Sequence, residues 1–437
     1  MDRQPGIWDH CLQQAAATDV GLRRSNNQDS MAVALAASQE QFDARGHVFV
    51  VADGMGAHAA GELASKLATD FIPLTYHKLG TLPPPDALLA AVEQANKHIN
   101  ERGSADPEFR GMGTTVDTLV VLPQGALVAH VGDSRVYRLR DECLEQLTFD
   151  HSLVWEMRAA GHLPDNEEEV PAFIPRNVIT RSMGPNPDVQ VDLEGPFPVQ
   201  PGDTFMLCSD GLCGQIGDPH IGQVLACLPP SEATQALIHL ANLHGGPDNI
   251  TVEVVQVDGP QRVEELGAAE VDRFDNGHGK TRPVHSIVWT LLGMIVLATI
   301  LCGAMQQWLA AGICLLLSAL GIGAALAYRF TPPSPTVFDS RPRGKGPYRQ
   351  TLCSPDMEFI GWVKDLTEQL RDAAEKEAWH IDWDRYHQHR DAAASAIAAG
   401  NLTEAGREYL RAVSVMMDQL KRQKEIQQKG DRAAGLF

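Results

Sequence analysis

The sequence predicts an α+β protein in its first 258 residues, followed by a hairpin of two apolar helices and a helical C-terminal segment. Short β-branched runs such as 47–51 and 115–121 alternate with segments of helical spacing such as 61–71, which together predict the α+β part. A long stretch without any charged residue predicts the hairpin. The chain has 437 residues, enough for about two or three domains.

The net charge lies in the α+β part. The chain carries 56 Asp+Glu and 36 Lys+Arg residues, a formal charge of −20. Residues 1–258 contain 35 acidic and 15 basic residues, whereas residues 259–437 contain 21 of each. Such an acidic surface repels nucleic-acid phosphates, so no nucleic-acid partner is expected.

The regular elements of the α+β part follow from periodicity. In 61–71 the apolar residues Leu63, Leu67 and Phe71 share one helical face, and 86–101 has similar spacing. Strands are expected where apolar and β-branched residues form short runs. The expected strands are 47–51, 115–121, 126–130, 203–207 and 250–257.

The uncharged stretch, 286–328, contains 43 residues without Asp, Glu, Lys, Arg or His. A bilayer crossing needs about 20 apolar residues, and the polar pair at 306–307 divides the stretch into two candidate helices. Basic residues flank both ends and are absent from the turn, so both flanking parts are expected on the cytoplasmic side. We expect a transmembrane hairpin in a multi-pass inner-membrane protein; a buried hairpin is the alternative.

Linkers rich in Pro, Gly or polar residues separate the expected parts of the chain. In the last part, a turn at 400–401 joins two expected helices that resemble half of a tetratricopeptide unit, a candidate site for recruiting a partner. The expected organisation is an α+β domain at 1–258, a linker at 259–285, the hairpin at 286–328, a Pro/Arg-rich linker at 329–356 and a helical segment at 357–430.

Aspartates stand at the ends of several expected strands. Carboxylates gathered at one sheet edge repel one another unless a divalent cation neutralises them. Oxygen ligands without paired Cys or His favour Mg²⁺ or Mn²⁺ over zinc. Solvated turns are the alternative. The aspartates are Asp29, Asp53, Asp133, Asp210 and Asp248.

Eight motifs, in order, resemble the metal-dependent serine/threonine protein phosphatases of the PPM (type 2C) family in their compact bacterial form. The resemblance implies a β-sandwich of two antiparallel sheets flanked by helices, with a two-metal centre at one end. The motifs lie at 18–29, 51–62, 111–115, 130–135, 147–152, 176–181, 208–212 and 245–251.

The resemblance also implies a ligand set for Mg²⁺ or Mn²⁺. Asp53 would bridge two ions, Asp210 and Asp248 would complete one of them, and the carbonyl of Gly54 would contact the other. Asp133, with Asp210, matches an additional metal position of bacterial members, so the site is expected to hold two ions, or three.

Three further residues receive catalytic roles from the resemblance. Arg24 would grip the substrate phosphate, and Asp29 would hold metal-bound waters. His58 would protonate the leaving group, or else serve as a structural hydrogen-bonding residue. The sequence departs from the usual pattern at Gln28, where Glu is common, and at Ala57, where Gly is common. A glycine position with positive φ would make Ala57 a strained residue.

The implied function is a membrane-anchored phosphatase that hydrolyses phosphoserine and phosphothreonine with a metal-bridged hydroxide. Its partners would be phosphorylated proteins of a signalling pathway linked to a Ser/Thr kinase. The acidic loop at 161–175 would favour basic phosphopeptides, or is simply solvated. A catalytically weak or inactive adaptor that binds phosphoproteins at the membrane is the alternative function.

Overall fold

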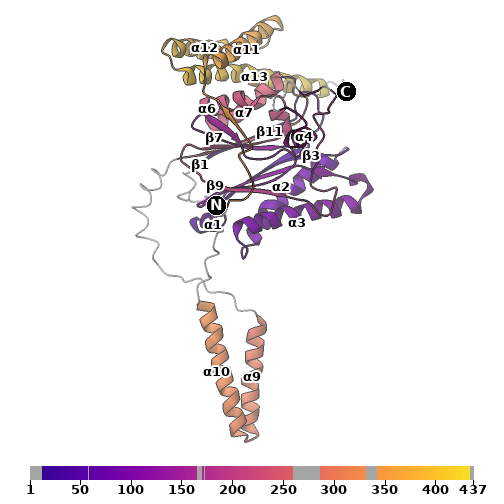
Figure 1. Cartoon of the computed structure of the whole chain (residues 1–437), viewed down its shortest axis with the longest axis vertical. Coiled ribbons are helices and arrows are strands. Elements are labelled where there is room, and N and C mark those ends of the chain that lie inside the picture. Colours follow the sequence, from indigo (N-terminus) through magenta and orange to yellow (C-terminus); the bar gives the residue numbers. More distant parts are fainter. Residues whose placement is uncertain are drawn as a thin grey trace. The chain divides into compact units, whose positions relative to one another are not determined.

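The computed structural model describes residues 12–57, 59–164, 170–171, 173–258, 286–330 and 342–433 (Figure 1). These residues form two compact units. One contains the described residues up to 258 together with those from 342 onward, and the other is a helical hairpin at 286–330.

Two antiparallel sheets form the centre of the first unit. One sheet has the order β1-β11-β10-β7-β8-β12, and the other has the order β2-β3-β5-β6-β9, with β4 paired to β3. The expected α+β sheet fold is therefore confirmed. The strands are β1 (Leu12–Asp19), β2 (Asp29–Ala34), β3 (His47–Met55), β4 (Gly113–Thr114), β5 (Val116–Leu122), β6 (Gly125–Val131), β7 (Arg135–Arg140), β8 (Cys143–Gln146), β9 (Asp192–Phe197), β10 (Thr204–Cys208), β11 (Ile250–Val257) and β12 (Arg349–Leu352).

A layer of apolar side chains joins the two sheets. Phe49 and Leu119 come from one sheet, and Val136, Phe205 and Val255 come from the other. Alternate residues of each strand point into this layer, while the residues between them face the helices outside. The strands are therefore buried on both faces, which explains their nearly continuous apolar runs.

Helices cover the outer faces of both sheets. The helices α2 (Ala60–Lys78) and α3 (Pro84–Ala105) share an apolar cluster with β3 and β5, and α6 (Asp218–Cys227) and α7 (Pro230–Leu243) share one with β7, β10 and β11. The shorter helices are α1 (Gln39–Arg45), the 3₁₀ turn η2 (Pro107–Phe109), α4 (Leu153–Ala159) and α5 (Asp210–Cys213).

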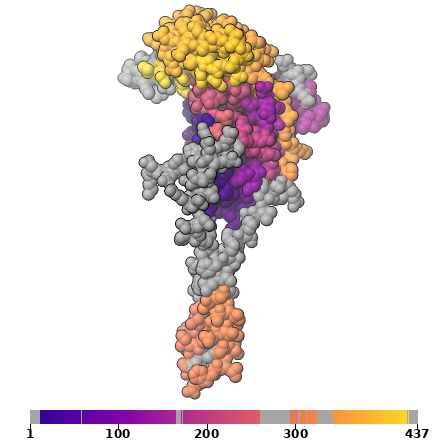
Figure 2. Space-filling model, turned by 90° about the vertical axis from the view of Figure 1, so that its left-hand side faces the viewer, coloured from indigo at the N-terminus to yellow at the C-terminus, as the bar shows by residue number. Residues whose placement is uncertain are grey.

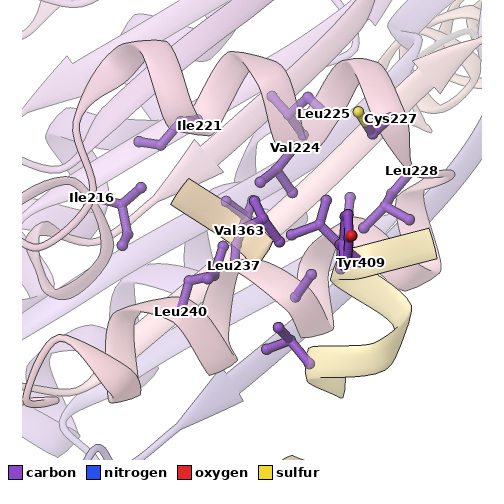
Figure 3. Close-up of a cluster of buried hydrophobic side chains, with 14 of the residues drawn as sticks. Ile216, Ile221, Val224, Leu225, Cys227, Leu228, Leu237, Leu240, Val363 and Tyr409 are labelled. Carbon is purple, nitrogen blue, oxygen red and sulfur yellow. The ribbon is translucent and has the colours of Figure 1, made fainter. Parts of the chain in front are cut away.

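The C-terminal helices belong to the same unit as the sheets. They are α11 (Met357–Lys376), α12 (Trp383–Ala398) and α13 (Leu402–Ala433). Val363 of α11 and Tyr409 of α13 lie among Val224 and Leu237 of α6 and α7 (Figure 3). Arg411 of α13 forms an ion pair with Glu232 of α7, with 2.7 Å between nitrogen and oxygen. Figure 2 shows these helices, in yellow, directly on the pink part of the chain.

The second unit corrects the expectation about the membrane. Helices α9 (Ser286–Ala304) and α10 (Trp308–Phe330) form and pack against each other. In the described part of the chain, no helix is both long and apolar enough to span a bilayer. The expected transmembrane hairpin and the inner-membrane location are therefore wrong, and the described residues give no support to the membrane as a partner.

One carboxyl group lies in the layer between the sheets. Glu253 of β11 is fully buried, and neither of its carboxyl oxygens has a hydrogen-bond partner in the described residues. Val255, two residues further along the strand, is part of the same layer. Burial raises the pKa of Glu253 well above its ordinary value. Burial therefore favours the protonated form of this carboxyl group in the folded chain.

We expect Glu253→Leu to stabilise the fold at neutral pH. The pKa of Glu253 is higher in the folded than in the unfolded chain, so the free energy of unfolding falls as pH rises from about 4.3 towards the folded-state pKa. In the Leu variant the free energy of unfolding should no longer fall over this pH range, and at pH 7 it should be about 1–3 kcal/mol higher than in wild type. Urea unfolding at pH 5 and pH 8 measures both effects, with Glu253→Gln as the neutral polar control. An equal pH dependence in wild type and Leu variant would contradict the expectation.

Candidate functional site

The fold brings the five strand-end aspartates towards one end of the sandwich. Asp29, the first residue of β2, lies directly opposite Asp53 of β3 in the strand register. Asp210 starts α5 just after β10, Asp248 precedes β11, and Asp133 lies between β6 and β7. Asp210, Asp133, Asp248 and Asp29 all act electrostatically on Asp53. The structure therefore brings these five carboxyl groups within electrostatic reach of one another.

Glycines beside two of the aspartates let separate backbone segments pass closely. A Cβ atom on Gly54 would lie 2.1 Å from the carbonyl oxygen of Gly61 and 2.5 Å from that of Gln28. A Cβ atom on Gly211 would lie 1.8 Å from the carbonyl oxygen of Asn249. Any other residue at either position would push apart the loops that carry the carboxylates.

The carboxylates disfavour one another's ionisation. Burial, then the charge of Asp29 and of the other neighbouring aspartates, raises the pKa of Asp53 well above its ordinary value. Burial raises the pKa of Asp29 to about 7, against the lowering effect of hydrogen bonds from Thr251 and Ser209. Burial, followed by the charge of Asp210, raises the pKa of Asp133 to about 7. A positive charge among these groups would lower all of these pKa values.

The chemistry of the donors suits a hard divalent cation. Asp29, Asp133 and Asp210 each have one buried carboxyl oxygen, Oδ1, without a hydrogen-bond partner in the described residues. Such oxygens are costly to bury unless a cation or water takes them up. Among the residues that the structure describes, however, no group of three or more His, Cys, Asp or Glu side chains is arranged to hold a metal ion. The metal ligand set, including the Gly54 carbonyl, therefore stays a prediction.

Arg24 lies at the edge of the carboxylate cluster. Its Nη2 donates a hydrogen bond of 2.6 Å to Oδ2 of Asp248, and 48% of the Arg24 side chain is exposed. A single contact leaves the guanidinium with other N–H groups for a substrate oxygen. The loop position is consistent with phosphate binding, and that role remains a prediction.

Asn249 anchors the loop that carries Arg24, a role that the sequence reading did not assign. Its Nδ2 donates to the carbonyl oxygens of Val20 (2.9 Å) and Asn26 (3.0 Å), and its Oδ1 accepts from the backbone N–H of Gln28 (2.8 Å). An amide is the side chain that combines two donors with an acceptor, so Asp or Leu would break the arrangement. The sequence signal that could have indicated this role is the Asp248-Asn249 pair directly before β11.

A cavity of about 330 Å³ opens beside the carboxylates. Asp133, Asp210 and Asp248 line one part of it, and Arg135 and Trp155 line another. Arg135 is held in place by Asp150, whose Oδ2 accepts from Nε (2.9 Å) and Nη2 (2.7 Å) of the guanidinium. This buried ion pair fixes Arg135 in the cavity wall. The sequence did not reveal the pair, because its two residues are 15 positions apart.

Four further features singled out from the sequence have different outcomes. His58 and the acidic residues at 165–169 lie outside the described residues. Gln28 donates a hydrogen bond from Nε2 to the carbonyl oxygen of Gly56 (3.2 Å). Ala57 is absent from the described non-glycine residues with positive φ, so this substitution causes no backbone strain.

Comparisons with known proteins agree on one family. The sequence pattern of the protein phosphatase 2C family matches residues 23–239. The chain is 36% identical to the protein phosphatase PhpP of Streptococcus pneumoniae over 251 residues, which are 56% of this chain and 98% of that protein. It is 32% identical over 252 residues to the serine/threonine phosphatase stp of Listeria monocytogenes, covering 56% of this chain and 96% of that protein. A solved structure of the S. agalactiae serine/threonine phosphatase is 36% identical, with a TM-score of 0.49 over 56% of this chain and 100% of the other.

We expect Mn²⁺ to raise the melting temperature of the wild-type chain. A ligand that binds only the folded state adds about 2.7 kcal/mol to the free energy of unfolding when its concentration is 100 times Kd. Bound Mn²⁺ would also relieve the repulsion between the carboxylates. In Asp210→Asn the metal-free protein should melt at or above the wild-type temperature, because one repelling charge is gone, and Mn²⁺ should have little effect. Thermal melts with and without Mn²⁺ test this, with Asp70→Asn on α2 as an exposed control. An equal Mn²⁺ shift in Asp210→Asn would contradict the expectation.

Proposed function

The chain belongs to the protein phosphatase 2C (PPM) family of metal-dependent protein serine/threonine phosphatases, and from this premise we propose how its carboxylate-lined cavity acts on phosphorylated proteins. The substrate would be a phosphoserine or phosphothreonine side chain whose phosphate enters beside Asp133, Asp210 and Asp248. The observation that carries this proposal is the gathering of five aspartates, three of which have a buried oxygen without a hydrogen-bond partner among the described residues.

The metal site would use the aspartates that the family resemblance marks. Asp53, Asp210 and Asp248, with Asp133 and the Gly54 carbonyl, would hold two or three Mg²⁺ or Mn²⁺ ions. When bound, such ions supply Lewis acidity and make a water molecule acidic enough to ionise at neutral pH. The raised pKa values of Asp53 and Asp133 support this assignment, because bound cations would favour the ionised form of carboxyl groups gathered in this way.

The chain's own residues would bind and orient the substrate. Arg24 would exchange its bond to Asp248 for two parallel bonds to phosphate oxygens, which its planar guanidinium allows. Asp29, which accepts a hydrogen bond from Oγ of Ser209 (2.8 Å), would hold water molecules of the site by accepting hydrogen bonds from them. His58 remains our candidate for the acid that protonates the leaving hydroxyl oxygen.

The partners follow from the activity. The proposed substrates are proteins phosphorylated by a Ser/Thr kinase, so this chain would oppose such a kinase in signalling. The position of Trp155 and Arg135 on the cavity wall would allow contact with the polypeptide around the phosphorylated residue.

Hydrolysis of p-nitrophenyl phosphate and of a phosphothreonine peptide should require Mn²⁺ or Mg²⁺. Asp53→Ala and Asp210→Ala should reduce kcat by at least 10²-fold, roughly the loss expected when preorganised charge stabilisation is removed from the transition state. Steady-state kinetics with and without EDTA measure this, and Asp70→Ala, an exposed aspartate on α2, serves as control. Full activity in EDTA would contradict the proposed function.

Arg24 variants test how the phosphate is held. Arg24→Ala should lower kcat/KM about 10- to 100-fold, because charge-assisted bonds to the phosphate contribute about 1.5–3 kcal/mol. Arg24→Lys should recover only part of this loss, because lysine presents a point charge rather than a planar fork. The same variants should weaken inhibition by inorganic phosphate. Unchanged phosphate inhibition in Arg24→Ala would exclude Arg24 as the phosphate-binding residue.

A further inference from the structure

A strap of the C-terminal segment, residues 343–354, closes the edge of the sandwich. Its strand β12 adds to β8 at the end of one sheet, with Arg349 opposite Gln146 and Leu352 opposite Cys143. The backbone N–H of Cys353 extends this pairing with a bond of 2.8 Å to the carbonyl oxygen of Glu142. The strap therefore continues the sheet of the α+β domain and is an integral part of it.

The strap is also bound to β9, the edge strand of the other sheet. Glu194 of β9 is 2% exposed; its Oε2 accepts from the backbone N–H groups of Lys345 (3.0 Å) and Gly346 (2.9 Å), and its Oε1 accepts from the Tyr348 hydroxyl (2.6 Å). Gly344 has φ +73°, and a Cβ atom there would lie 1.8 Å from Oε2 of Glu194. A residue with a side chain at position 344 would collide with the carboxylate of Glu194, so the close approach of the strap to Glu194 requires glycine there.

The strap places one side chain against the wall of the active-site cavity. The guanidinium carbon of Arg349 lies 4.9 Å from the centre of the Trp155 ring, within the range of a cation–π contact. Trp155, on α4, is also contacted by Arg135 at 5.7 Å and edge-on by Phe149 at 5.3 Å. Arg349 is further fixed by Asp218, with 3.5 Å between Nη1 and Oδ2. Trp155 is therefore restrained from two different parts of the chain.

We propose that Arg349 is a positioning residue for protein substrates, because it holds Trp155 and the α4 wall of the cavity in place. Trp155 lines the same cavity as Asp133, Asp210 and Asp248. The inference rests on the proposed phosphatase function, and it concerns a residue outside the range 23–239 that the family pattern matches. The C-terminal segment thereby takes part in substrate binding through the strap.

The effect should depend on the size of the substrate. A small phosphate ester needs the carboxylates and Arg24, whereas a phosphopeptide also covers the cavity wall. Loss of the Arg349 contact should therefore raise KM for the peptide and leave the small ester largely unaffected. A general structural defect would lower activity on both substrates together.

The test compares full-length Arg349→Ala, Arg349→Lys and Gln350→Ala with wild type. Gln350 is exposed on the opposite face of β12 and is bonded to Glu145, which makes it a matched control. KM and kcat are measured with Mn²⁺ for a phosphothreonine peptide and for p-nitrophenyl phosphate. Hydrogen exchange of residues 153–159 reports the position of α4 independently of activity.

We expect Arg349→Ala to raise the peptide KM by about 3- to 30-fold, to change p-nitrophenyl phosphate kinetics by less than about twofold and to speed exchange at 153–159. Arg349→Lys should be intermediate, and adding Trp155→Ala to Arg349→Ala should cause less than the sum of the two losses. An unchanged peptide KM, or equal losses on both substrates, would overturn the inference. A wild-type protein that hydrolyses neither substrate would instead refute the proposed function. If hydrogen exchange at 153–159 were still faster in Arg349→Ala, Arg349 would be a structural contact of α4 without a role in substrate binding, and the inference would be wrong.

Discussion

The mutual repulsion of buried carboxylates is the constraint on which the site depends. Asp29 and Asp53 face each other across neighbouring strands, and Asp133, Asp210 and Asp248 raise the cost of ionising them further. Backbone structure holds the groups together despite this cost. The strand register places two of them, and close passages at glycines place the loops of the others. The burial of apolar side chains on both faces of each sheet offsets the free-energy cost of this repulsion.

The C-terminal segment enlarges that apolar support. Its helices α11 and α13 contribute Val363 and Tyr409 to the cluster on α6 and α7, and Arg411 pairs with Glu232 at the rim. The strap at 343–354 joins the edge strands of both sheets through Glu194 and β12. Relatives that align along nearly their whole length cover only about half of this chain. The C-terminal segment therefore lies outside the region that aligns with these relatives, and it packs into the same unit as the sheets.

Errors of the sequence reading have physical causes. The uncharged stretch at 286–328 was read as a membrane hairpin from its apolar composition, its length and the basic residues at its ends; the described helices there do not meet the requirement for a bilayer crossing. Strand β12 was overlooked because four residues between Pro- and Gly-containing turns carry too little periodic signal, and a partner strand about 200 residues away decides their conformation. Ala57 was suspected of strain, but only backbone coordinates could show that its φ is not positive.

The sequence by itself determined the α+β class and the family, and it predicted the aspartates of the candidate site. These follow from local patterns: alternating apolar runs, and short motifs in a recognisable order. Only the tertiary structure decided that Asn249 anchors the Arg24 loop, that Asp150 holds Arg135, and that Arg349 reaches Trp155. The reason is that hydrogen bonds, ion pairs and ring contacts join residues that are distant along the chain. Their partners depend on strand register and packing, which no local pattern specifies.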